Sequence, residues 1–298
     1  METHSKCNIC PRSCDVDRDA QFGICQVSNT LKVARAALHF WEEPCISGEN
    51  GSGAVFFSGC PLHCVFCQNE EISHGKVGEE ISIDRLVEIY LSLQEKGANN
   101  INLVTGTHYI PAIVESVKMA REKGLNLPIV YNTSGYETVE SLKLLEGIVN
   151  VYLPDFKYMD FELAKKYSHA LDYPDIAKQA IDEMVRQLPE LEFDENGFIQ
   201  SGVIVRQLLL PGHIKDSKAI IKYLYEKYGD KIYISMMSQY TPMPHLKSEY
   251  SELSRRVTKR EYESVVDYAI SLGIENGFIQ DRHVAKESFI PSFGNEIL

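Results

Sequence analysis

Short apolar runs alternate with amphipathic stretches along the chain from about residue 54 to residue 272. A short apolar run bounded by glycine, proline or polar residues is typical of a buried strand, and apolar side chains three and four residues apart indicate a helix with one buried face. Strands are predicted at 54–58, 101–104, 128–131, 149–153, 203–209 and 231–236. Helices are predicted at 82–96, 112–123, 139–145, 160–188 with Pro174 as a break, 217–228 and 258–272, and a hairpin at 192–200.

This alternation of strands and helices predicts a parallel sheet covered by helices. About six strand–helix units fall short of the eight in a closed barrel, so the predicted fold is α/β, a partial, open (β/α)6 barrel. Residues 51–298 are expected to form this core domain together with a C-terminal tail. Residues 1–50 contain five of the eight cysteines and are expected to form a small metal-binding extension.

Polar residues follow the ends of the predicted strands. Thr105–His108 follow the second strand, Asn132–Gly135 the third and Asp155–Lys157 the fourth, while Arg206 lies within the fifth. In folds of this type the carboxyl ends of the strands form the functional edge. The sequence therefore predicts one polar site at this edge. Simpler roles stay open, because Arg206 could equally be a buried salt-bridge partner and Asp155 with Lys157 an ion pair.

A cysteine motif leaves the end of the first predicted strand. Cys60, Cys64 and Cys67 have the spacing C-x3-C-x2-C, which places three thiols in one short loop. Thiolates suit iron–sulfur clusters, which usually take four cysteines, and three ligands leave one iron with an open position. A zinc ion would need a fourth ligand, and His63 is held between two of the cysteines in a loop too tight to reach the same metal well. The motif therefore indicates a [4Fe–4S] cluster.

A second group of cysteines lies in the extension. Cys7, Cys10, Cys14 and Cys25 supply four thiols within nineteen residues. That number suits a tetrahedral zinc site and suits an auxiliary iron–sulfur cluster equally well, so the identity of the metal stays open. Cys45 has no cysteine nearby and is expected to be a small apolar filler. Structural roles are also expected for solvent-facing Glu42 and Glu43 and for the loop residues His108, His213, Tyr240 and His245.

Composition narrows the class of protein. Hydrophobic residues make up 44% and charged residues 24% of the 298, which is ordinary for a globular protein. The net charge of -12 argues against a nucleic-acid partner, because phosphate binding needs clustered lysine and arginine. No apolar run is long enough to span a membrane, and the first ten residues carry no apolar signal-peptide core. A cytoplasmic location in an anaerobic or oxygen-poor cell is expected.

The cysteine loop resembles the signature of the radical S-adenosylmethionine (SAM) enzymes, and the chain as a whole resembles the pyruvate formate-lyase activating enzyme branch of that superfamily. Within this branch it is most similar to a subfamily of activases with an N-terminal four-cysteine segment. The resemblance runs from about residue 7 to at least residue 246. It is carried by CPRSCDVDR, RAALHFWEEPCISGE, VFFSGCPLHCVFCQN, LPDFKYMD and VRQLLLPGH, in that order.

This resemblance implies roles for particular residues around SAM. The fourth iron would bind the amino and carboxylate groups of SAM, and Phe66 would pack near its adenine. The superfamily often has Gly-Gly-Glu where this chain has Thr-Gly-Thr-His, and Asn132 replaces an aspartate at a site for a monovalent cation. The residues implied to contact SAM are Phe66, Gly106, Thr107, Asn132, Thr133, Asp155, Lys157 and Arg206.

The resemblance also implies a reaction and its partners. Reduced flavodoxin or ferredoxin would supply one electron, SAM would give a 5′-deoxyadenosyl radical, and a glycine of a separate glycyl-radical enzyme would lose an α-hydrogen. No general acid or base is assigned, since the cofactors supply the chemistry. Two other classes stay open: a radical SAM enzyme acting on a small molecule or peptide, and a non-catalytic iron–sulfur or zinc electron carrier.

Overall fold

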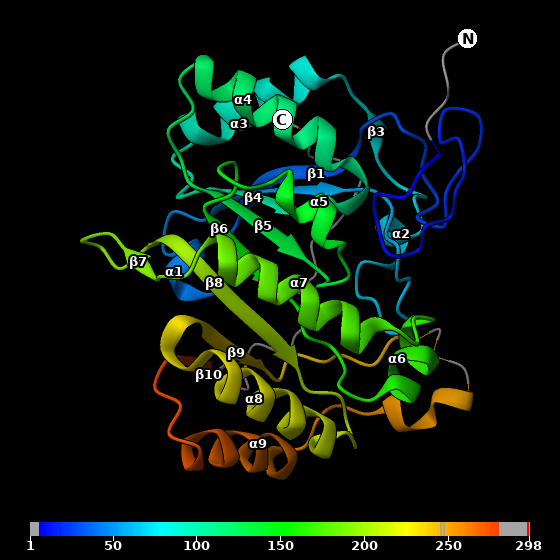
Figure 1. Cartoon of the computed structure of the whole chain (residues 1–298), viewed down its shortest axis with the longest axis vertical. Coiled ribbons are helices and arrows are strands. Elements are labelled where there is room, and N and C mark those ends of the chain that lie inside the picture. The colour runs from blue at the N-terminus through cyan, green and yellow to red at the C-terminus, as the bar shows by residue number, and fades with distance from the viewer. Residues whose placement is uncertain (1–5, 245, 247, 280–296, 298) are drawn as a thin grey trace.

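The computed structural model describes residues 6–244, 246, 248–279 and 297. In this described part the strands form one ten-stranded sheet in the order β10-β9-β8-β6-β5-β4-β2-β1-β3, with β7 paired to β8 (Figure 1). The strands are β1 (Lys32–His39), β2 (Ser52–Phe57), β3 (Glu79–Glu80), β4 (Ile101–Val104), β5 (Ile129–Thr133), β6 (Val151–Pro154), β7 (Glu192–Phe193), β8 (Ile199–Leu208), β9 (Tyr233–Met237) and β10 (Gly277–Ile279).

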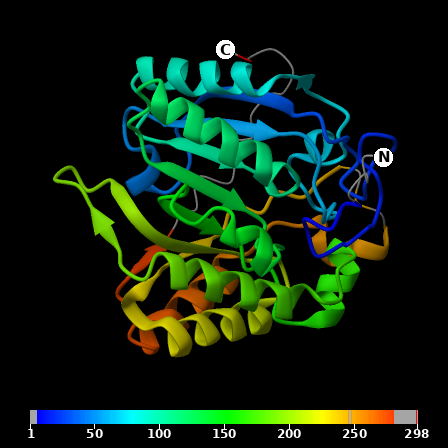
Figure 2. The same ribbon diagram turned by 45° about the horizontal axis from the view of Figure 1, so that its top comes forward.

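Helices connect these strands. The α-helices are α1 (Pro44–Ser47), α2 (Glu70–Ser73), α3 (Ile83–Glu95), α4 (Ile110–Glu122), α5 (Val139–Lys143), α6 (Phe161–Ser168), α7 (Tyr173–Gln187), α8 (Ile214–Tyr228) and α9 (Lys259–Ser271). The 3-10 helices within the described ranges are η1 (Thr107–Tyr109), η2 (Gly229–Lys231) and η3 (Ser248–Ser254). Figures 1 and 2 show the longer helices on the outside of the curved sheet.

The predicted open α/β barrel is confirmed. From β2 to β10 every neighbouring pair along the sheet is parallel, whereas β1 joins β2 antiparallel. Among the described residues the sheet order ends at β10 on one side and at β3 on the other, so these strands do not close a barrel. The predicted hairpin is also present, as β7 and β8 pair antiparallel.

The strand β1 was not expected from the sequence. It lies within residues 1–50, so the sheet begins before residue 51. Its partner β2 is buried along its whole length, because β1 covers one of its edges and β4 the other. The remaining part of the extension, residues 6–31, has no helix or strand and is called the head below.

The predicted helix 160–188 is two helices, α6 and α7. The first ends at His169, which adopts a left-handed backbone with φ of +52°. Pro174 lies in the first turn of the second helix, where proline is tolerated because the amide it lacks would have no helical partner. The proline therefore starts a helix, and the break predicted at this residue falls a few positions earlier.

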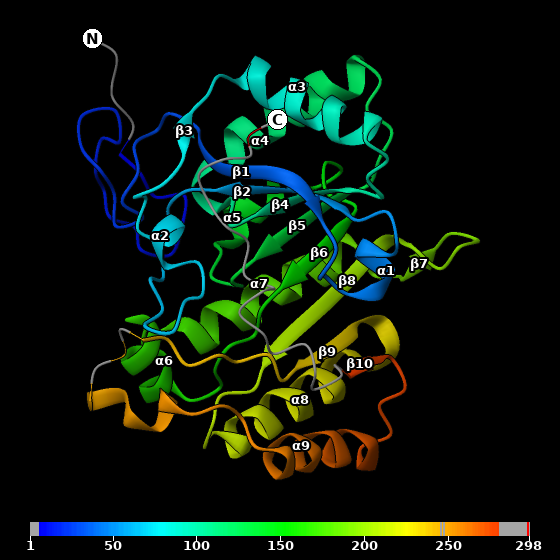
Figure 3. The same cartoon turned by 180° about the vertical axis from the view of Figure 1, so that it is seen from behind.

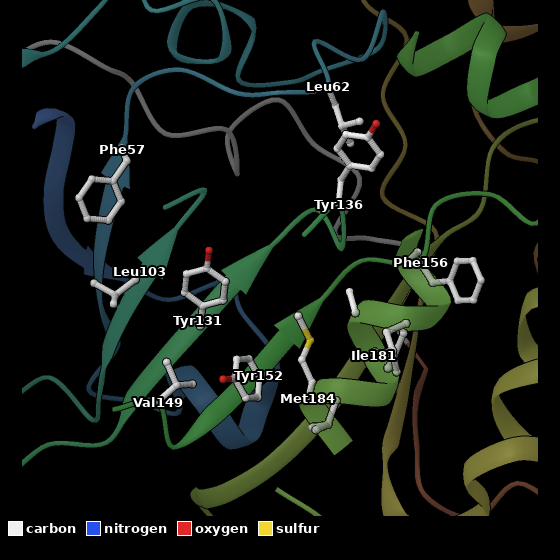
Figure 4. Packing of buried hydrophobic residues seen from close by; sticks show 14 of the residues in the cluster. Phe57, Leu62, Leu103, Tyr131, Tyr136, Val149, Tyr152, Phe156, Ile181 and Met184 are labelled. Atoms are coloured by element: carbon white, nitrogen blue, oxygen red, sulfur yellow. The ribbon is translucent and has the colours of Figure 1, made fainter. Parts of the chain in front are cut away.

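Successive residues of the strands face opposite sides of the sheet. On β5, Tyr131 belongs to the main core between sheet and helices, which Figure 4 shows together with Tyr152 and Met184. Val130, one position earlier, packs on the inner face in a separate cluster with Cys45 and Ile46 of α1. Cys45 is thus the apolar filler that was predicted. Figure 3 shows α1 beside β8, which places the segment after β1 along the inner face.

Candidate active site

The cysteine loop, residues 58–69, begins where β2 ends. The amide of Gly59 donates to the carbonyl of Ile72 over 2.8 Å, which holds the start of the loop. Gly59 has φ of +92°, and a Cβ built there would lie 2.7 Å from the carbonyl oxygen of Cys25 in the head. Glycine is required at this position, because any side chain would collide with the head.

The three cysteines of this loop are partly exposed, and Cys64 and Cys67 line a cleft at the carboxyl ends of the strands. Burial raises the pKa of the Cys60 thiol to about 11 and that of the Cys67 thiol to about 12, since a thiolate loses hydration there. A bound metal would displace these protons. Among the described residues no three histidine, cysteine or acidic side chains lie close enough together to hold one metal ion. Three thiols on one loop at a cleft are a donor set that suits an iron–sulfur cluster.

Four of the polar side chains predicted for the site meet in this cleft. Arg206 donates from Nε to Asp155 (2.9 Å) and from Nη2 to the side-chain oxygen of Asn132 (2.6 Å). Lys157 donates to the other oxygen of Asp155 over 2.5 Å. Burial alone would raise the pKa of Asp155, but the positive charges of Arg206 and Lys157 hold it below its ordinary range. The ion pairs that the sequence left open are therefore present, and they lie in the cleft.

Glu42 is the site residue that the sequence analysis missed. It accepts hydrogen bonds from Arg206 Nη1 (3.1 Å) and from the side-chain amides of Asn132 (3.1 Å) and Asn102 (3.2 Å). Only 9% of its side chain is exposed, and Glu43 is buried as well, so the expectation that both face solvent is wrong. The chain after β1 follows the inner face of the sheet, and this path brings both carboxylates inside.

The sequence does hold a signal for this pairing. Asn102 lies within an otherwise apolar strand and Arg206 directly follows the apolar run 203–205 of β8, and such buried polar groups require partners. Glu42 and Glu43 are the acids of a segment that also contains Trp41 and Pro44. Glu42 is 60 positions from Asn102 and 164 positions from Arg206 in the sequence. A local sequence pattern therefore cannot predict that this acid is their partner.

Thr107 and Thr133 were predicted to contact SAM, but their hydroxyls point to a buried acid instead. Both donate to Glu137, Thr107 over 2.7 Å, and Tyr131 donates to the same oxygen over 3.3 Å. The second carboxylate oxygen of Glu137 has no hydrogen-bond partner in the structure. Burial raises the pKa of Glu137 to about 7. A Cβ on neighbouring Gly106 would lie 2.5 Å from the Ile113 side chain, which explains the glycine there by packing.

Phe66 lines the cleft next to the cysteines, and three tyrosine rings, which we call its tyrosine base, pack against it. Its ring meets Tyr158, Tyr167 and Tyr240 edge-on at centroid separations of 6.5, 6.3 and 6.1 Å. Edge-to-face contacts of this kind hold an aromatic ring in one orientation. Tyr240 lies in the loop after β9 and has a structural role, as predicted, and part of that role is to support Phe66 at the site.

The predicted loop histidines have structural partners where the structure describes them. His108 is buried and donates from Nε2 to the carbonyl of Ser58 (2.7 Å), the first residue of the cysteine loop. His213 contacts the hydroxyl of Tyr167 through Nε2 at 2.9 Å. His245 lies outside the described residues.

Cys14 and Cys25 of the head both approach Gly23, although the described head cysteines do not converge into a group that could hold a metal. A Cβ on Gly23 would lie 3.3 Å from the sulfur of Cys14 and 3.4 Å from that of Cys25. Burial, together with the negative charges of Glu137 and the neighbouring cysteines, raises the pKa of Cys10 to about 12. The head also contacts the cysteine loop directly, since the amide of Cys60 donates to the carbonyl of Cys25 over 3.3 Å.

Comparison with known proteins identifies the class to which this fold and cleft belong. Residues 54–191 match the family described as the radical SAM superfamily. Residues 54–191 of this chain therefore form a radical SAM domain, and such a domain implies a [4Fe–4S] cluster, SAM and radical chemistry that uses them. An uncharacterized protein of Methanocaldococcus jannaschii, MJ0674, is 30% identical over 275 residues, which cover 88% of this chain and 74% of that protein.

Solved structures show the same fold at low sequence identity. SuiB of Streptococcus suis, crystallised with its precursor peptide SuiA, has a TM-score of 0.51 at 12% identity over 76% of this chain and 47% of SuiB. The FeFe-hydrogenase maturase HydG of Carboxydothermus hydrogenoformans has a TM-score of 0.51 at 13% identity over 78% of this chain and 54% of HydG. The chain thus spans about half the length of both enzymes. In the part of the chain that the structure describes, no helix has the length and apolar character needed to span a membrane.

Proposed function

We propose that Cys60, Cys64 and Cys67 bind the [4Fe–4S] cluster and that the adjoining cleft binds SAM. One observation carries this proposal: the cysteine loop and the buried charges of Asp155, Lys157 and Arg206 face the same cleft at the carboxyl ends of the strands. A loop of three thiols leaves one iron open for a ligand. The cleft offers that ligand fixed charges of both signs.

The residues of the cleft are suited to holding the ends of SAM. Arg206 and Lys157 present cationic donors for a carboxylate, and Glu42 presents an acceptor for an amino group. An incoming carboxylate competes with Glu42 for Arg206, so binding at Arg206 frees the acid to accept from the amino group. Phe66, fixed by its tyrosine base, offers an apolar face to adenine. When bound, the cluster and SAM supply the 5′-deoxyadenosyl radical that removes a hydrogen atom from the substrate.

We further propose that this substrate is a glycine of a partner glycyl-radical enzyme. The balance is one electron from reduced flavodoxin or ferredoxin and one SAM, which give methionine, 5′-deoxyadenosine and a glycyl radical that has lost its α-hydrogen. The sequence resemblance to activases supports this choice. Phe40 and Trp41 are 46% and 55% exposed, and Trp41 lines the cleft, which offers an apolar contact for a peptide segment at its mouth.

The remaining cofactor proposals differ in their support. The sequence spacing of Cys7, Cys10, Cys14 and Cys25 supports a second metal, zinc or iron–sulfur, in the head. A monovalent cation beside SAM is supported less, because both oxygens of Asp155 already accept from cationic side chains.

Cleavage of SAM is the direct experiment. Protein reconstituted anaerobically with iron and sulfide is reduced with dithionite, given SAM and assayed for 5′-deoxyadenosine. We expect Cys64→Ala to abolish cleavage and to lower the iron content. Cys45→Ala, a cysteine buried away from the loop, is the matched control and should keep both. Full cleavage in Cys64→Ala would remove the cysteine loop from the site.

The activase role has its own experiment. The reduced, SAM-loaded protein is mixed with candidate glycyl-radical enzymes, beginning with any encoded beside it, and the mixture is examined by electron paramagnetic resonance (EPR). We expect a glycyl radical doublet that requires SAM and Cys64. If SAM is cleaved while no protein radical forms with any candidate, a peptide or small-molecule substrate replaces the activase proposal.

A further inference from the structure

A serine at the end of α6 contacts a sulfur of the cysteine loop. The hydroxyl of Ser168 lies 2.9 Å from the sulfur of Cys64 and 2.8 Å from the hydroxyl of Tyr158. Ser168 and Tyr158 are both buried, at 0% and 1% exposure. A metal-bound cysteine sulfur has no proton and can only accept. The single O–H group of Ser168 must therefore donate its hydrogen bond to Cys64, and the hydroxyl of Tyr158 must donate to Ser168.

The head fixes the end of the same helix. Arg12 donates from Nη2 to the carbonyl of Ser168 (3.0 Å) and from Nη1 to that of His169 (2.6 Å). These are among the last carbonyls of α6, which lack partners within the helix, and a positive charge at a helix C-terminus is favourable. The guanidinium also lies over the ring of Tyr136, 5.3 Å from its centroid.

Arg12 reaches the cysteine loop as well. Its Nε donates to the carbonyl of Pro61 over 2.7 Å, one residue after Cys60. A second bond joins the loop to α6 without the head, from the amide of Val65 to the carbonyl of Tyr167 (2.8 Å). One head side chain therefore spans the cysteine loop and the helix end that carries Ser168. Figures 1 and 3 show the head on the same side of the molecule as α6.

We propose that Arg12 and Ser168 form a latch through which the head sets the reduction potential of the cluster. This inference rests on the proposed function, because it requires Cys64 to be a cluster ligand. A hydrogen bond to a ligand sulfur stabilises the reduced, more negative cluster, and hydrogen bonds to sulfur are among the features that set cluster potentials. The latch therefore makes the cluster easier to reduce. Arg12, Tyr158 and Ser168 are positioning residues in this scheme.

Potentiometric titration monitored by EPR measures this effect without any assay of turnover. In Ser168→Ala we expect wild-type iron and sulfide content and a more negative midpoint potential. Arg12→Lys keeps the charge but cannot bridge three carbonyls, and it should shift the potential in the same direction by a smaller amount. Ser271→Ala is the matched control, because Ser271 is the last residue of α9 as Ser168 is of α6 and is exposed. Its potential should equal that of the wild type.

The outcomes separate the latch from the proposed function. A wild-type protein that binds no cluster would overturn the proposed function itself. A fully loaded Ser168→Ala protein with the wild-type potential would overturn the latch alone. If Ser168→Ala does not retain its cluster, Arg12→Lys decides, since it leaves Ser168 in place and changes only the contacts from the head. A wild-type potential in loaded Arg12→Lys would then reject the latch.

Discussion

At the scale of single residues, Arg206 organises the charges of the cleft. Its guanidinium meets Asp155, Glu42 and Asn132, which come from three separate segments of the chain. A buried charge is tolerated when it is paired, and removing one partner leaves the others uncompensated. Arg206 therefore supports the fold even before any ligand binds.

Replacement of Arg206 should show this cost. Arg206→Ala leaves Glu42 and Asp155 buried with less positive charge, and we expect the free energy of unfolding to fall by roughly 3–5 kcal/mol. Adding Glu42→Gln should restore part of that loss, since the two residues are coupled. Denaturant unfolding of the metal-free protein measures both. Arg85→Ala, which breaks the exposed pair with Glu88, is the control and should cost about 1 kcal/mol or less. A loss that small in Arg206→Ala would show that the cluster of charges does not support the fold.

Glu137 should make stability depend on pH. Burial raises its pKa to about 7 in the folded protein, so between its ordinary value and 7 the folded state binds more protons than the unfolded state. Stability contributed by the protonated acid is complete at low pH and is lost as pH rises toward 7, by roughly 2–4 kcal/mol in total.

The variant Glu137→Gln removes this titration while keeping an acceptor for Thr107, Thr133 and Tyr131. Unfolding free energies at pH 5 and pH 8 should differ less in the variant than in the wild type. Glu140→Gln, three residues further along the chain on α5 and exposed, is the control and should follow the wild type. An identical pH dependence in Glu137→Gln and wild type would show that Glu137 is ionised throughout.

At the scale of elements, periodicity located most of the fold because each helix buries one face. The predicted helix 112–123 is α4, Ile110–Glu122, and the predicted strand 101–104 is β4, Ile101–Val104. The end of α6 could not be placed in this way, since it depends on the carbonyl of His169 meeting Arg12, 157 residues earlier. The same limit applies to the site. The three cysteines lie within eight residues and form a motif that the sequence alone reveals, whereas the role of Glu42 becomes visible only in the folded structure.

The last long helix, α9, begins with reciprocal hydrogen bonds. Thr258 accepts from the amide of Glu261 (3.3 Å), and Glu261 accepts from the amide of Thr258 (2.8 Å), which is a capping box. We expect Thr258→Ala to lower the free energy of unfolding by about 1 kcal/mol and Thr258→Ser to leave it nearly unchanged. Thermal unfolding of the three proteins side by side measures this. Equal stability of Thr258→Ala and wild type would mean that the hydrogen bond Glu261 accepts from the Gly212 amide and its pairing with Arg255 suffice to hold the helix start.

At the scale of the whole molecule, the head is joined to the cysteine loop and to the end of α6 by side-chain and backbone contacts, although it contains no regular element of its own in residues 6–31. Segments this short lack the apolar area for an independent core and are commonly stabilised by a metal. The four cysteines of the head are the donors available for that purpose.

Loss of these cysteines should therefore cost both metal and stability. In the variant with Cys7, Cys10, Cys14 and Cys25 all changed to alanine, we expect a lower metal-to-protein ratio and a lower melting temperature, because metal binding contributes folding energy. SAM cleavage uncoupled from any substrate should persist at a reduced level, since the cysteine loop is intact. Unchanged metal content in this variant would contradict a second site, and Cys45→Ala serves as the control.

The latch also fixes an order of events during synthesis. Arg12 and Ser168 are 156 positions apart. At about 5–20 residues per second, Ser168 is added roughly 8–31 s after Arg12. All seven cysteines of the head and the loop have been made well before the helix end that covers them. The cysteines are therefore accessible to metal while the chain is still being synthesised. In a host that translates more slowly, this period of access is longer.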